Sequence, residues 1–231
     1  MKRQVMVIGL GRFGTNLATA LSRLGYEVLA VDTNERRTQT IASEVTRVAQ
    51  ADATDEDVLR DLDAGSFDIA IVAIGSAIES SVLATILLKK FEVPYIIARA
   101  NNELHGSILT RIGADMVVYP EMDAGARLAH LVRAKNVVEH IPVAKNYGVT
   151  KLTAPHHFID HELSAIGFDQ EGDKGVSLIL LQRGDEIILN PEMTEKVQED
   201  DVLIVAGKGD DLERLLTRAE KKYAQKEEKE T

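Results

Sequence analysis

Short apolar runs alternate with longer amphipathic stretches through the first half of the chain. Six of these runs carry the branched side chains typical of strands that are buried on both faces of a parallel sheet. They are Val5–Ile8, Val28–Val31, Thr46–Ala49, Ile69–Ala73, Tyr95–Ala98 and Met116–Tyr119. Between them, apolar positions recur at helical spacing. Strands that alternate with helices predict an α/β fold, a Rossmann-like doubly wound sheet of six parallel strands whose C-terminal ends share one edge.

The pattern changes from about residue 146 onward. The stretches GVTKLTAP, GVSLILLQRGDEIILNP and DDVLIVAG predict short strands with a hairpin turn at 183–185, and DHELSAIG predicts a short helix. The last residues lack apolar periodicity and indicate a frayed helix or a flexible tail. We therefore expect a Rossmann-like domain at 1–122, a crossover or linker helix region at 123–142, a small α+β domain at 143–216 and a flexible tail at 217–231.

The first predicted strand runs into a glycine-rich turn, VIGLGRFG. Gly9, Gly11 and Gly14 form G-x-G-x-x-G, in which the glycines permit a tight turn, close approach of a pyrophosphate and packing of the next helix. Backbone N–H groups at the start of that helix would face the anion. Asp32 ends the second strand, eighteen residues after Gly14, where a carboxylate can bind ribose hydroxyls. The alternative for Asp32 is a helix N-cap.

The composition of the chain argues against several classes of function. The chain has 231 residues, 45% of them hydrophobic, with a net charge of −10, so nucleic acid is not an expected partner. It contains no cysteine, which excludes disulfides and cysteine nucleophiles and is typical of the cytoplasm. The most apolar stretch, IAIVAIGSAIESSVLATILLKK, contains Gly75 and Glu79 and indicates a buried strand, a turn and a helix, without membrane insertion.

An enzyme with this fold also needs a catalytic side chain, because a nucleotide-binding fold without one only holds its ligand. Tyr147 and Lys151 form the Y-x-x-x-K pair of short-chain dehydrogenases, but no serine lies between Ser107 and Ser164 and the glycine loop has a different pattern. In HHFIDH, His157 and His161 are spaced for one helix face, yet no third metal ligand is implied. We expect a protein that is not an enzyme, with an NAD-dependent oxidoreductase as the alternative.

Several longer strings together resemble one family. VIGLGRFG, ADATDEDVL and RIGADMVVYPE, with ESSVLATILLKK between them, resemble the RCK-type regulatory subunits of the bacterial Ktr and Trk potassium uptake systems, over nearly the whole chain. The resemblance implies a cytoplasmic subunit that binds ATP, ADP or NAD(H). It also implies homodimers in an octameric ring, which gates a separate membrane-embedded potassium channel subunit at the inner face of the membrane.

The resemblance also implies roles for individual residues. The matched positions are Gly9, Gly11, Arg12, Phe13 and Gly14 at the phosphates, Asp32, Thr33 and Asn34 around the ribose, Asp52 and Ala53 near the adenine, and Ile74, Gly75 and Arg99 along the rest of the pocket. Arg12 is expected to reach the γ-phosphate of a nucleotide in the neighbouring subunit, which ADP lacks. The alternative for Arg12 is a solvated surface position.

Three further expectations concern specificity. Glu121 matches a carboxylate that helps bind Mg²⁺ or Ca²⁺ at the dimer interface, with a helix N-terminal acid after Pro120 as the alternative. Cyclic di-AMP is not an expected ligand, because acidic residues stand where the family carries an arginine: Asp169, Glu171 and Asp173. Asp32, followed by Thr33 and not by an arginine, is expected to exclude 2′-phosphorylated cofactors.

Overall fold

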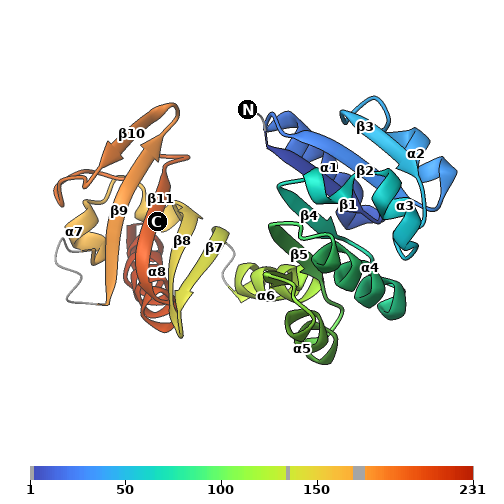
Figure 1. The fold of residues 1–231 in the computed structure, drawn as a ribbon. Helices are drawn as coiled ribbons and strands as arrows, with labels where there is room; N and C mark the ends of the chain where they lie inside the picture. Colours follow the sequence, from blue (N-terminus) through green and yellow to red (C-terminus); the bar gives the residue numbers. More distant parts are fainter. Residues whose placement is uncertain (1–2, 134–135, 169–174, 231) are drawn as a thin grey trace. The chain divides into compact units, whose positions relative to one another are not determined.

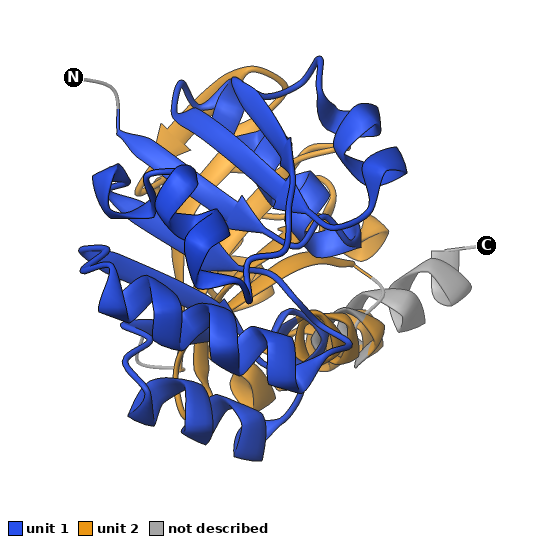
Figure 2. Cartoon of the chain, turned by 45° about the vertical axis from the view of Figure 1, so that its right-hand side comes forward, with its two compact units in different colours: residues 1–123 blue, residues 124–231 orange. Residues whose placement is uncertain are grey.

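A computed structural model describes residues 3–133, 136–168 and 175–230 of the chain (Figure 1). The chain forms two compact units, Met1–Asp123 and Ala124–Thr231, which Figure 2 shows in blue and orange. Within the described ranges, no helix has both the length and the apolar character needed to cross a membrane.

The first unit is a parallel sheet of six strands with helices on both faces, so the predicted fold class is confirmed. The strands are β1 (Gln4–Ile8), β2 (Glu27–Asp32), β3 (Arg47–Gln50), β4 (Ile69–Val72), β5 (Tyr95–Arg99) and β6 (Met116–Val118), in the order β3-β2-β1-β4-β5-β6. The helices are α1 (Arg12–Arg23), α2 (Glu35–Ile41), α3 (Glu56–Asp61), η1 (Ala64–Ser66), α4 (Ile78–Lys90) and α5 (Glu103–Arg111), and α6 (Pro120–Arg133) begins at the end of this unit.

Alternate residues of β1 are buried in two different cores. Met6 packs in the core that also buries residues of α3, α4 and α5, whereas Val7 packs in the core that buries residues of α1 and α2. Strands covered on both faces explain the continuous apolar runs in the sequence. The strand order reverses at β1, which has β2 on one side and β4 on the other. The crevice beyond the C-terminal ends of such strands is the usual ligand position in this architecture.

The second unit is an antiparallel sheet with a long helix packed against it. Its elements are β7 (Val137–Ala144), β8 (Tyr147–Thr153), η2 (His156–Phe158), α7 (Leu163–Ile166), β9 (Val176–Arg183), β10 (Glu186–Leu189), β11 (Val202–Lys208) and the long helix α8 (Gly209–Glu230). The strands lie in the order β10-β9-β11-β8-β7. The predicted hairpin at 183–185 joins β9 to β10, and the predicted short helix is α7.

Three elements differ from the sequence-based expectation. Strand β7 begins within the expected linker region 123–142; it is an edge strand with exposed apolar residues, so its sequence lacks the alternation of a half-buried strand. Helix α6 begins at Pro120 and not at Asp123, because proline is well tolerated in a first helical turn. Helix α8 continues through the expected tail to Glu230, and Ala219 is buried in the core of the second unit.

Candidate functional site

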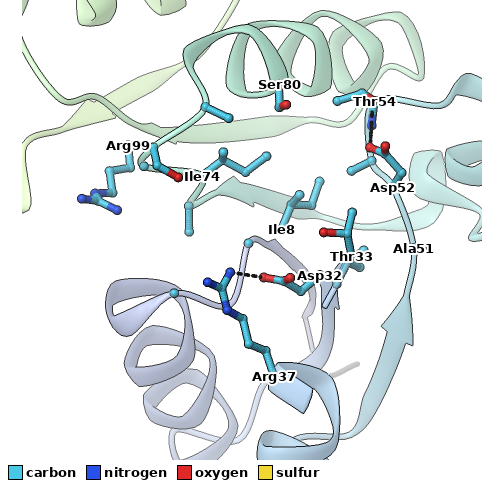
Figure 3. Close-up of a pocket in the computed structure, with 18 residues that line it drawn as sticks. Ile8, Asp32, Thr33, Arg37, Ala51, Asp52, Thr54, Ile74, Ser80 and Arg99 are labelled. Atoms are coloured by element: carbon cyan, nitrogen blue, oxygen red, sulfur yellow. Dashed lines mark hydrogen bonds and ion pairs between the residues drawn. The ribbon is translucent and has the colours of Figure 1, made fainter. Parts of the chain in front are cut away.

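A cavity of about 640 Å³ lies at the C-terminal ends of the strands of the first unit, around the point where the strand order reverses (Figure 3). The predicted residues that line it are Gly9, Gly11, Asp32, Thr33, Asp52, Ala53, Ile74, Gly75 and Arg99. The predicted residues that do not line it are Arg12, Phe13, Gly14, Asn34 and Glu121. The other lining residues are Ile8, Val31, Arg37, Ala51, Thr54, Ala73, Ser76, Ala77 and Ser80.

Each glycine of the glycine loop meets a different structural requirement. Gly9 has a φ of +94°, which side chains disfavour, and a Cβ on Gly14 would collide with the carbonyl oxygen of Gly9. A Cβ on Gly11 would meet no heavy atom within 4 Å, and Gly11 lines the cavity. Gly11 is also the N-cap of α1, where no side chain caps the helix and no acidic residue lies in the first turn. The helix therefore presents uncapped N–H groups beside the cavity, which favours an anion there.

The carboxylate of Asp32 holds the loop to the end of β2. One oxygen accepts a hydrogen bond of 2.7 Å from the backbone N–H of Leu10, and the other accepts one of 2.8 Å from the N–H of Asn34. Asp32 is only 7% exposed. The N-cap of α2 is Asn34, whose side chain accepts from the N–H of Arg37, so the N-cap alternative for Asp32 is wrong. Asp32 supports the loop and also faces the cavity.

Arg37 is a cavity residue that the sequence analysis missed. Its guanidinium Nη1 lies 3.3 Å from a carboxylate oxygen of Asp32, as Figure 3 shows. The prediction that 2′-phosphorylated cofactors are excluded rested on Thr33, which directly follows Asp32 and is not an arginine. Because α2 begins at Glu35, its first turn brings Arg37 back to Asp32. An arginine near this carboxylate can accommodate a 2′-phosphate, so the argument for exclusion loses its premise.

The two ends of the cavity differ in chemistry. At one end, Asp52 accepts hydrogen bonds from the N–H and the hydroxyl of Thr54, at 2.9 and 2.7 Å, in a turn after β3. Arg99, at the end of β5, lies at the opposite end of the cavity in Figure 3. The N-terminus of α1 and the guanidinium groups of Arg99 and Arg37 contribute positive potential, whereas Asp32 and Asp52 supply acceptors for hydroxyl and amino groups.

Arg99 also connects the cavity with α6. Its Nη2 lies 2.6 Å from Oε1 of Glu121, and its guanidinium lies 6.0 Å from the centre of the Phe13 ring. Glu121 lies in the first turn of α6, the position that the alternative of a helix N-terminal acid predicts. Among the described residues, no group of three or more histidine or carboxylate side chains could hold a metal ion. The role of Glu121 at a cation shared between subunits stays a prediction.

The other candidates lie elsewhere in the chain. Tyr147 and Lys151 both belong to β8 of the second unit, whereas the glycine loop belongs to the first. His157 lies in the short helix η2, and the ring of His161 contacts the carbonyl oxygen of Ile159. The acidic positions compared with the cyclic di-AMP site, Asp169, Glu171 and Asp173, lie outside the described residues.

Two domain families match this chain. The model of the TrkA-N domain matches residues 5–120, and that of the TrkA-C domain matches residues 151–219. The chain is 36% identical to the Ktr system potassium uptake protein C of Bacillus subtilis (strain 168) over 218 residues, which cover 94% of this chain and 98% of that protein. The chain belongs to the family of the Ktr potassium uptake proteins. The resemblance inferred from the sequence is confirmed.

A second Ktr relative fits this assignment, and a solved structure shares the fold. The Ktr system potassium uptake protein A of the same Bacillus subtilis strain is 36% identical over 213 residues, covering 92% of this chain and 95% of that protein. The fold also matches the structure titled "GsuK channel bound to NAD", with a TM-score of 0.52 and 21% identity, over 97% of this chain and 38% of that one.

Proposed function

We propose that this Ktr-family protein regulates potassium uptake by binding a nucleotide in the cavity of the first unit. The observation that carries the proposal is the position of the glycine loop and of Asp32, which face one cavity where the strand order reverses. A volume of about 640 Å³ lies in the range of small-molecule and cofactor sites.

The chemistry of the cavity suits an adenine nucleotide bound in one orientation. The uncapped start of α1 and the guanidinium of Arg99 would receive the phosphates, since both favour negative charge. Asp32 would accept from the ribose, and the turn at Asp52 would lie near the base. ATP and ADP are the proposed ligands, with NAD(H) as a further candidate, because the GsuK channel of similar fold was solved with NAD.

The regulatory role follows from the Ktr relatives. A potassium uptake system needs a membrane-embedded path for the ion, and we propose a separate potassium channel subunit as the partner, contacted from the cytoplasmic face of the membrane. Homodimers that assemble into an octameric ring would carry the nucleotide signal to that partner, and Arg12, exposed at the start of α1, would sense the γ-phosphate across a subunit boundary. The protein would bind its nucleotide without converting it.

The loop offers a clean test of the site. Gly11→Ala adds a methyl group into open space beside the cavity, at a backbone conformation (φ −71°) that alanine adopts readily. We expect this variant to keep its unfolding midpoint but to bind ATP and ADP at least roughly tenfold more weakly by calorimetry, about 1.4 kcal/mol. Gly125→Ala is the matched control, because a Cβ there also meets nothing within 4 Å but Gly125 lies outside the cavity.

Two results would contradict the proposal. Equal nucleotide affinity for Gly11→Ala, Gly125→Ala and the unchanged protein would place the ligand elsewhere. Sustained oxidation of NADH by the purified protein with any member of a panel of carbonyl compounds would support the oxidoreductase alternative.

A further inference from the structure

Arg99 contacts three segments of the first unit that are far apart in the sequence. It lines the cavity, its Nη2 pairs with Glu121 at 2.6 Å, its guanidinium faces the Phe13 ring, and it fills the space that a side chain on Gly75 would take. The ion pair links residues 22 positions apart and connects the end of β5 with the first turn of α6. A change in the partner of Arg99 would therefore act directly on the start of that helix.

The present partners of Arg99 satisfy its charge incompletely. Its Nε is enclosed and has no hydrogen-bond partner among the described residues, although the donors of a charged group are costly to leave unpaired in a protein interior. The Arg99 side chain is 17% exposed, but that of Glu121 is 66% exposed. Water and salt screen a pair in which one member is so exposed, so Glu121 holds the guanidinium weakly.

A nucleotide phosphate is a stronger partner for the same guanidinium. The phosphate chain of ADP or ATP carries more negative charge in total than one carboxylate, and its oxygens, like those of a carboxylate, can take two parallel hydrogen bonds from an arginine. The wall of the cavity gives the guanidinium room, because Gly75 has no Cβ and any Cβ at this position would collide with Arg99. The carbonyl of Gly75 accepts a hydrogen bond from the side-chain amide of Asn101, which connects this wall to the segment that follows β5.

We propose that Glu121 and a nucleotide phosphate compete for Arg99, so that nucleotide binding releases Glu121 and loosens the first turn of α6. The proposal rests on the proposed nucleotide site and adds the residue pair that senses occupancy. Helix α6 begins in the first unit and continues past Asp123 into the second, so a signal received at Glu121 enters the segment that joins the two units.

The test is a double-mutant cycle on the full-length protein, with ATP and ADP titrated by calorimetry in EDTA so that no cation bridges Glu121 and the phosphates. We expect Glu121→Gln to raise nucleotide affinity at least threefold, because the competitor is removed. We expect Arg99→Gln to lower it at least tenfold. In the Arg99→Gln background, Glu121→Gln should no longer raise the affinity.

Asp123→Asn is the matched control, since it removes the other acidic charge from the same helical turn and should leave nucleotide affinity unchanged. Arg99→Met replaces Arg99→Gln in the cycle if the glutamine variant does not fold; it also removes the charge and keeps an unbranched, flexible side chain. Amide hydrogen exchange supplies a second readout: nucleotide should speed exchange at residues 121–124 in the unchanged protein, and Glu121→Gln should show fast exchange there already.

The possible outcomes distinguish failure of the competition for Arg99 from failure of the nucleotide site. If the unchanged protein binds no nucleotide at millimolar concentration, the proposed function fails together with this inference. If it binds and Glu121→Gln leaves the affinity unchanged or lowers it, the competition is refuted and the nucleotide site stands. An equal gain from Glu121→Gln with and without Arg99, or from Asp123→Asn, would show general charge repulsion and also refute it.

Discussion

Asp32→Ala should destabilise the glycine loop as well as weaken the ligand site. In the unchanged protein the carboxylate accepts a 2.7 Å hydrogen bond from the N–H of Leu10, a residue that is 2% exposed. Removing the acceptor leaves that buried N–H unpaired, at a cost of about 1–3 kcal/mol. The N–H of Asn34 is at an exposed residue and water can replace its partner. The half-exposed ion pair with Arg37 adds about 0–1 kcal/mol. The expected loss of stability of the first unit is therefore about 1–4 kcal/mol.

Two measurements on the full-length protein check this estimate. Urea unfolding followed by circular dichroism gives the loss of stability, and amide hydrogen exchange at Leu10 reports the loop directly. Asp52→Ala is the matched control: Asp52 lines the same cavity, but it is exposed, and among the residues that the structure describes its side chain bonds within its own turn. We expect a change within about 0.5 kcal/mol for that variant. Unchanged Leu10 exchange and unchanged stability in Asp32→Ala would refute the supporting role and leave Asp32 as a ligand contact alone.

Two more predictions concern packing away from the phosphates. His105 is 1% exposed, and burial lowers its pKa below the usual value; the folded state thus favours the neutral ring, and stability should fall as the pH drops below about 6.5. His105→Gln should flatten the difference in urea midpoint between pH 7.5 and 5.5, and an unchanged difference would assign the effect to other groups. In the second unit, Arg183 bonds to Asp201, which is fully buried, and to Glu195. Arg183→Met should lower the free energy of unfolding, measured in urea, by about 3–5 kcal/mol, because the buried carboxylate of Asp201 loses its ion-pair partner. Its nucleotide affinity should be unchanged, and weaker binding would show that the two units depend on one another.

The sequence alone determined the features that depend on local chemistry. Apolar runs between helical patterns indicate parallel strands because both faces of such a sheet are covered, and the six strands are found where they were predicted. Glycine spacing identifies the loop because Gly9 needs a positive φ and Gly14 has no room for a Cβ. Strands that end at one edge also brought Gly9, Asp32, Asp52 and Gly75 to one cavity, since parallel topology places those ends together.

Only the tertiary structure decided which side chains meet across that edge. Asp32 meets Leu10 and Arg37, and Arg99 meets Glu121; each pair depends on which strand ends are neighbours and on how the next helix turns. No period or motif encodes such contacts, because they join residues from separate elements. The edge strand β7 was not predicted for a related reason. It forms by pairing with β8, and its mostly exposed residues show no alternation of apolar and polar positions.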